Sequence, residues 1–96
     1  MLKFERIELD GIGRKTNFED RQWANLELSL QDTETDHMRV VGLNVMVPKR
    51  PDATLRELEE AARSEGIAIL EVALQVLRQS TVAELMAQEF AADNPS

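Results

Sequence analysis

The stretch Arg39–Leu58, RVVGLNVMVPKRPDATLREL, contains the change from a strand pattern to a helix pattern that decides the fold. Its first nine residues alternate, which places four apolar side chains on one face of a predicted strand: Val41, Leu43, Val45 and Val47. Pro48 ends this strand, and the polar segment Lys49–Asp52 follows it. Thr54 and Glu57 then have the spacing of a capping box, which predicts that a helix begins there. The stretch therefore predicts a sheet followed by helices.

Upstream of this stretch the period of two continues. It predicts strands over about 2–9, 23–31 and 38–47, with a slip between Phe4 and Ile7 that suggests a bulge. The polar segment Gln31–His37 suits a hairpin between the second and third strands, whereas Asp10–Gln22 is a longer loop. Because the third strand is the richest in β-branched residues, we expect it at the centre of the sheet.

Downstream, the period changes to that of a helix. Ile67–Leu77 reads IAILEVALQVL, and its polar side chains fall in a single lane with Arg78, so apolar side chains occupy roughly 220° of the helix surface. We expect helices over about 55–65, 67–79 and 82–91, with Gly66 ending or kinking the first of them. Residues 93–96 are expected to form a flexible tail. The predicted fold is α+β, a three-stranded antiparallel meander followed by two or three C-terminal helices packed on one sheet face.

Length and composition set the class of protein. Ninety-six residues with 43% apolar content predict one small globular domain, over about 1–92. The chain contains no cysteine, and charges near its start occupy the place where a signal peptide needs an apolar run, so we expect a cytoplasmic protein with no membrane association. Residues 51–96 hold nine acidic and three basic residues, a net −6 of the total −7. This field opposes nucleic acid and favours either solubility, as an ordinary solvated acidic face, or a basic protein partner.

No motif for catalysis, a cofactor or a metal is complete. Asp32, Glu34 and Asp36 have the spacing of the first ligands of a calcium loop, but the later glycine and glutamate positions hold other residues. The segment 11–16, GIGRKT, lacks the order of a phosphate-binding loop, although three basic residues in and near it form a candidate site for an anion or an acidic partner: Arg14, Lys15 and Arg21. We therefore predict no catalytic residue, no cofactor and no metal.

Two segments suggest DNA-binding families. Val45–Pro48, followed by a helix, Gly66 and a second apolar helix, resembles a ribbon-helix-helix repressor, and Ala62, Gly66 and Val72 fit the spacing of a helix-turn-helix. The first resemblance implies a dimer that reads DNA with paired strands and buries its second helix at the dimer centre. The net charge of −7, and the uncharged Asn44 and Met46 on the face of the strand that would read bases, count against DNA.

The excess of apolar surface on 67–77 is the strongest functional signal in the sequence. One face of that helix is expected to cover the sheet and one flank to meet the third helix, which leaves a flank for another chain. The candidate interface residues are Ile67, Leu70, Leu74 and, on the outer sheet face, Trp23. We therefore predict a small non-enzymatic protein-interaction module that acts as a homodimer. A ribbon-helix-helix-like DNA-binding regulator is the alternative, and a carboxylate-dependent enzyme is third.

Overall fold

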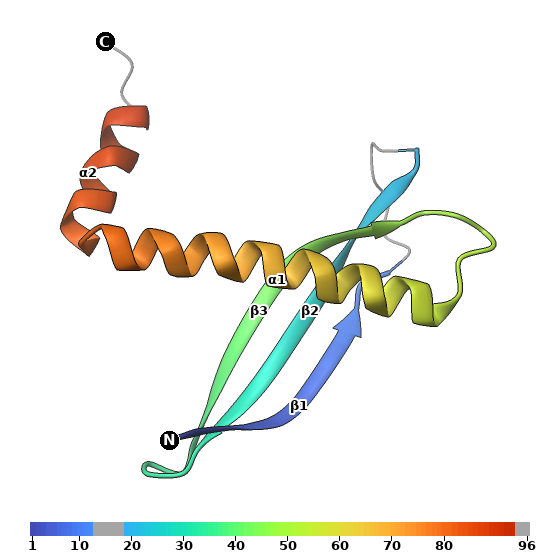
Figure 1. Ribbon diagram of the computed structural model, residues 1–96, viewed down its shortest axis with the longest axis horizontal. Helices are drawn as coiled ribbons and strands as arrows, with labels where there is room; N and C mark the ends of the chain where they lie inside the picture. The colour runs from blue at the N-terminus through green and yellow to red at the C-terminus, as the bar shows by residue number, and fades with distance from the viewer. Residues whose placement is uncertain (13–18, 94–96) are drawn as a thin grey trace. The chain divides into compact units, whose positions relative to one another are not determined.

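The computed structural model describes residues 1–12 and 19–93, of which 90–93 by their backbone alone. It confirms the predicted α+β class, with a three-stranded antiparallel sheet followed by two helices (Figure 1). The elements in chain order are β1 (Leu2–Asp10), β2 (Arg21–Asp32), β3 (His37–Pro48), α1 (Leu55–Gln79) and α2 (Val82–Asp93). The chain divides into two compact units, Met1–Gly66 and Ile67–Ser96, which are described separately. The single domain over 1–92 stays a prediction.

The three strands follow one another across the sheet in the order β1-β2-β3. The expected hairpin is confirmed, since Asp32 pairs with His37 at the end of the β2–β3 ladder. The bulge is confirmed too, because the β1–β2 register shifts between Phe4 and Arg6. The prediction that the third strand is central is wrong: β2 is central and β3 is an edge strand. A sequential meander puts the middle strand at the centre whatever its β-branched content, and an edge tolerates Pro48.

One face of the sheet carries the core of the Met1–Gly66 unit. Its buried apolar side chains are Ala24, Leu26, Val45 and Val47 from the sheet and Ala62 from α1. Gly66 is buried on the same face, and a Cβ built on it would lie 3.0 Å from Leu26 Cδ2 and 3.5 Å from Leu43 Cδ1. The helix thus approaches the sheet closely at a residue that has no side chain.

Gly66 therefore has a different role from the one that the sequence suggested. A single helix, α1, runs from Leu55 to Gln79 through Gly66, so the structure has two of the two or three helices expected, and Gly66 does not separate helices over 55–65 and 67–79. Packing against β2 and β3 explains this glycine, because tertiary contact outweighs the roughly 1 kcal/mol by which glycine disfavours a helix interior. α2 extends to Asp93, slightly beyond the predicted 91.

The two capping boxes differ in their completeness. At α2 both hydrogen bonds form: Glu84 N–H donates to Thr81 Oγ1 over 3.1 Å, and Thr81 N–H donates to Glu84 Oε1 over 3.0 Å. At α1 the Glu57 N–H donates to Thr54 Oγ1, while the Glu57 carboxylate accepts from Arg50 over 2.6 Å. The Glu57 side chain thus links the polar segment Lys49–Asp52 to the first turn of α1.

Side chains engage the outer edge of β3 near its end. Met46 N–H donates to Glu65 Oε1 of α1 over 3.1 Å, and Gln22 Nε2 donates to the Pro48 carbonyl over 3.0 Å. Pro48 itself has no N–H to offer a further strand. This edge is therefore partly closed by α1 and by proline. Within the described part of the chain, no helix is long and apolar enough to cross a membrane.

Candidate functional site

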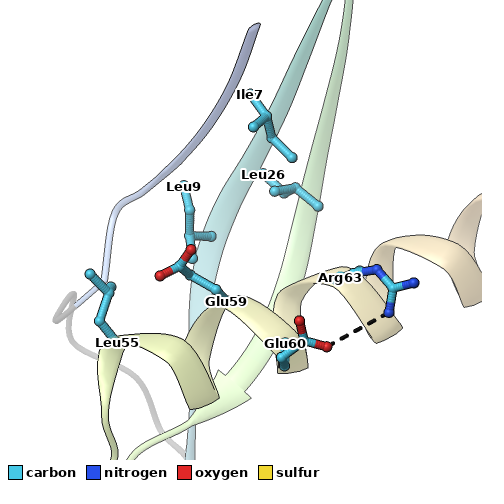
Figure 2. A pocket seen from close by; sticks show the side chains of 7 residues that line it. All are labelled: Ile7, Leu9, Leu26, Leu55, Glu59, Glu60 and Arg63. Carbon is cyan, nitrogen blue, oxygen red and sulfur yellow. Dashed lines mark ion pairs between the residues drawn. The ribbon is translucent and has the colours of Figure 1, made fainter. Parts of the chain in front are cut away.

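A groove in the Met1–Gly66 unit lies between β1 and the first turns of α1. Figure 2 shows its lining, which consists of Ile7, Leu9, Leu26, Leu55, Glu59, Glu60 and Arg63. Its volume is about 390 Å³, and its apolar floor comes mainly from the sheet and Leu55. Glu60 and Arg63 form an ion pair of 3.7 Å along the rim, drawn as a dashed line. The groove offers an apolar surface with an acidic border, and none of these lining residues is a histidine or carries a hydroxyl.

The strand that borders this groove has a free edge. Among the described strands, β1 pairs only with β2, so the N–H and C=O groups on its other edge have no strand partner. Pairing with β2 places Ile7 opposite Leu28 and Leu9 opposite Leu26, which puts both side chains on the face that carries the core. Leu2 and Phe4 lie on that face as well, opposite Asp32 and Leu30. Phe4 is 58% exposed there.

The predicted interface residues of the helix are all accessible. Ile67, Leu70 and Leu74 follow one another on one flank of α1, and Leu74 is 48% exposed. Leu77, in the last turn of α1, is exposed as well, at 64%. Further exposed apolar residues of the Ile67–Ser96 unit are Val72, Val76, Val82 and Met86. The unit therefore presents a large apolar surface.

The remaining predicted residues lie elsewhere. Trp23 pairs with Met46 on the outer face of the sheet and is 46% exposed, whereas its neighbour Ala24 is buried. In the candidate anion loop, Arg14 and Lys15 lie outside the described residues, as does most of the loop around them. Arg21 begins β2 opposite Pro48. The structure thus leaves the anion site untested.

The three acidic residues of the segment 32–36 lie at the β2–β3 turn and shape its geometry. Asp32 Oδ1 accepts the Glu34 N–H over 3.0 Å, and Asp36 N–H donates to the Asp32 carbonyl over 2.9 Å. Asp36 has a φ of 58°, a left-handed conformation that aspartate tolerates better than most residues. In the described ranges 1–12 and 19–93, no group of three or more His, Cys, Asp or Glu side chains is arranged to hold a metal ion. The spacing is explained by turn geometry.

The same hydrogen bonds give the turn a pH dependence. The Glu34 N–H, with further bonds from Thr35 and the charge of Arg39, lowers the pKa of Asp32 below its ordinary 3.8, against the opposing effect of burial. A lowered pKa in the folded state adds stability above the ordinary pKa, and that stability is lost as pH falls through the lowered value. Urea denaturation between pH 2 and 6 should therefore show Asp32→Asn losing stability relative to the parent as pH rises to about 5, and a constant difference above that. A difference independent of pH would contradict the assignment.

Comparisons with known proteins add no family to this picture. No protein-family model, curated protein or solved structure matches the chain. The function therefore has to be argued from the surfaces themselves.

Two features of these surfaces escaped the sequence reasoning. The groove beside β1 depends on where α1 crosses the sheet, and the pattern of apolar residues contains no signal for that. The free edge of β1 could have been predicted from the sequence, because a three-stranded meander always leaves its first strand at an edge. Its sequence, LKFERIEL over Leu2–Leu9, also has a symmetry of charge that is visible without any structure.

Proposed function

We propose that this chain is a non-enzymatic protein-interaction module that binds another protein through the apolar surface of the Ile67–Ser96 unit. The observation that carries the proposal is the exposure of eight large apolar side chains between Ile67 and Met86. Patches of more than a few hundred Å² are uncommon on monomeric soluble proteins and mark interaction sites when they occur. The helical spacing of these residues suits docking into a groove of a partner.

Charge indicates the chemistry of that partner. Residues 67–96 hold four acidic residues and one basic residue, a net −3. A partner with an apolar groove and a basic border would complement this surface, since such complementarity accelerates and orients association. We also propose that the module acts as a homodimer, the commonest closed assembly. The DNA-binding alternative has less support, because the outer edge of β3, which would have to pair with a second copy, is engaged by Glu65 and ends at Pro48.

The test substitutes a central residue of this surface. Leu74→Glu should abolish partner capture from cells of the source organism, because it places a charge where an apolar contact is needed. Gln75→Glu is the matched control, since it adds the same charge one residue along α1, in the polar lane. The measurement is quantitative mass spectrometry of proteins retained by each variant, with circular dichroism to verify the helix content.

The two variants separate the possible outcomes. A protein retained by the parent and by Gln75→Glu but lost from Leu74→Glu supports the proposal. An identical set of proteins retained by all three chains would contradict it, because the apolar surface would then play no part in binding. Since Leu74 is already half-exposed, its substitution should change the free energy of unfolding by about 0.5 kcal/mol or less.

A further inference from the structure

We propose that two copies of this chain pair through the free edges of β1, antiparallel about a two-fold axis, to form one continuous six-stranded sheet. This inference rests on the homodimer of the proposed function and assigns its surface. It uses no residue of the Ile67–Ser96 unit. Four observations carry it: the charge pattern of β1, the position of its bulge, the like-charged pair that β1 forms with β2, and the groove beside β1.

The charge pattern of β1 is complementary to itself. With the axis between Glu5 and Arg6, each of these residues faces the other in the second copy, and Lys3 faces Glu8. Apolar residues face apolar residues in the same register, since Leu2 meets Leu9 and Phe4 meets Ile7. Every basic residue of the segment is thus opposite an acidic one, which stabilises a pair of antiparallel strands, whereas like charges would oppose it.

The bulge makes this register physically possible. In a regular strand, residues of even and odd number point to opposite faces, so Phe4 and Ile7 would not share a face. The register shift between Phe4 and Arg6 changes this phase, because Phe4 pairs with Leu30 while Ile7 pairs with Leu28. All four apolar residues of β1 therefore lie on the core face. In the proposed pairing of two β1 strands, Phe4 of one copy and Ile7 of the other therefore point to the same side of the sheet, although they lie on opposite sides of the bulge along the sequence.

The neighbouring strand supplies an unfavourable contact that pairing would offset. Glu8 lies directly opposite Glu27 of β2, and like charges at such positions destabilise a sheet. Glu8 is 3.4 Å from Arg6 of its own strand, which compensates in part. Lys3 of a second copy would lie on the other side of Glu8, on the same face of the sheet, and would neutralise the remaining charge of Glu8.

The groove accommodates the apolar residues of the second copy. Facing side chains in an antiparallel pair lie about 5 Å apart, so Phe4 of the second copy would lie beside Ile7 and its Leu2 beside Leu9. Ile7 and Leu9 line the groove, together with Leu55 of α1 (Figure 2). Phe4 and Ile7, both more than half exposed in one chain, would cover each other. The edge of β3, engaged by Glu65 and ended by Pro48, offers no equivalent surface.

Charge reversal provides the test. Lys3→Glu and Glu8→Lys should each weaken the dimer roughly tenfold or more, because each change turns two attractive facing pairs into repulsive ones. Mixing the two variants in equal amounts should restore a dimer with one copy of each. In that mixed dimer both acidic side chains of the Lys3→Glu copy, at positions 3 and 8, would face the two lysines of the Glu8→Lys copy.

Two further variants complete the set. The double variant, with both charges reversed in one chain, should form its own homodimer, because opposite charges face each other again. Lys49→Glu, the same change beyond the end of β3, is the matched control and should leave the dimer intact.

Sedimentation equilibrium over 1 μM to 1 mM, with native mass spectrometry of the mixtures, distinguishes the outcomes. A parent chain that stays monomeric throughout would overturn both this pairing and the proposed homodimer, while the partner capture described above would still stand or fall separately. A dimer unaffected by Lys3→Glu and Glu8→Lys, or dissociated by Leu74→Glu instead, would overturn the pairing through β1 alone. Two weakened variants that fail to combine with each other would also overturn it.

Discussion

Val45→Asp is expected to unfold the Met1–Gly66 unit. Val45 is 0% exposed and lies opposite Ala24 at the centre of the core. A carboxylate placed there would lie among apolar side chains, and burial of an unpaired charge costs several kcal/mol. The folded state of a small domain is stabilised by only about 5–15 kcal/mol in total. We therefore expect a loss of at least about 3 kcal/mol in the free energy of unfolding, measured by urea denaturation followed by circular dichroism.

The same substitution on the other face of β3 is the control. Val40 lies five residues earlier in the strand and is 56% exposed on the outer face. Val40→Asp should cost about 1 kcal/mol or less, because only the lower strand propensity of aspartate is lost. Equal destabilisation by the two variants would show that the sheet is not buried on the face described here. Val40 lies outside the proposed β1 interface, so dimerisation does not affect the comparison.

Gly66→Leu should have the next largest effect, a loss of about 2 kcal/mol. A Cβ at this position would already lie 3.0 Å from Leu26 Cδ2, and the three further carbons of leucine have no space between α1 and the sheet. Overpacking of a core typically costs about 1–3 kcal/mol, and the helix propensity gained over glycine offsets less than about 1 kcal/mol of it. The change should appear as a lower urea midpoint.

Two further substitutions separate packing from propensity. Gly66→Ala should leave the stability nearly unchanged, because the atom it meets is the end of a leucine side chain that can shift, and alanine favours the helix by about 1 kcal/mol. Gly42→Leu should be neutral or slightly stabilising, since a Cβ there has nothing within 4 Å. If Gly66→Leu raised the stability, the close approach of α1 to the sheet would be disproved.

The sequence predicted the elements well because their signals are local. Alternation over Arg39–Val47 places Val45 and Val47 on a buried face, and the side chains of Thr54 and Thr81 cap the two helices that follow. The bulge in β1 was also predictable from the sequence, because Phe4 and Ile7 can lie on the same face of the sheet only if the alternation is interrupted between them. Each of these signals depends on residues a few positions apart, where backbone geometry fixes which side chains share a face.

The errors arose where distant contacts decide the structure. Gly66 has the local pattern of a helix end, and only its contact with Leu26 and Leu43 explains a continuous α1. The central position of β2 follows from connectivity and not from β-branched content. The candidate interface on Ile67–Leu77 was predictable as an excess of apolar surface, whereas the groove beside β1 was not, because it is formed by elements far apart in the sequence.

The different lengths of the two strand connections impose an order on folding and assembly. Four residues join β2 to β3, and ten join β1 to β2. Because the entropy lost on closing a loop grows with its length, we expect the β2–β3 hairpin to form first and β1 to join it later. The edge that we assign to dimerisation exists only once β1 has joined. A chain in which β1 has not yet joined the sheet therefore lacks the surface that we assign to self-association, so assembly requires a complete sheet.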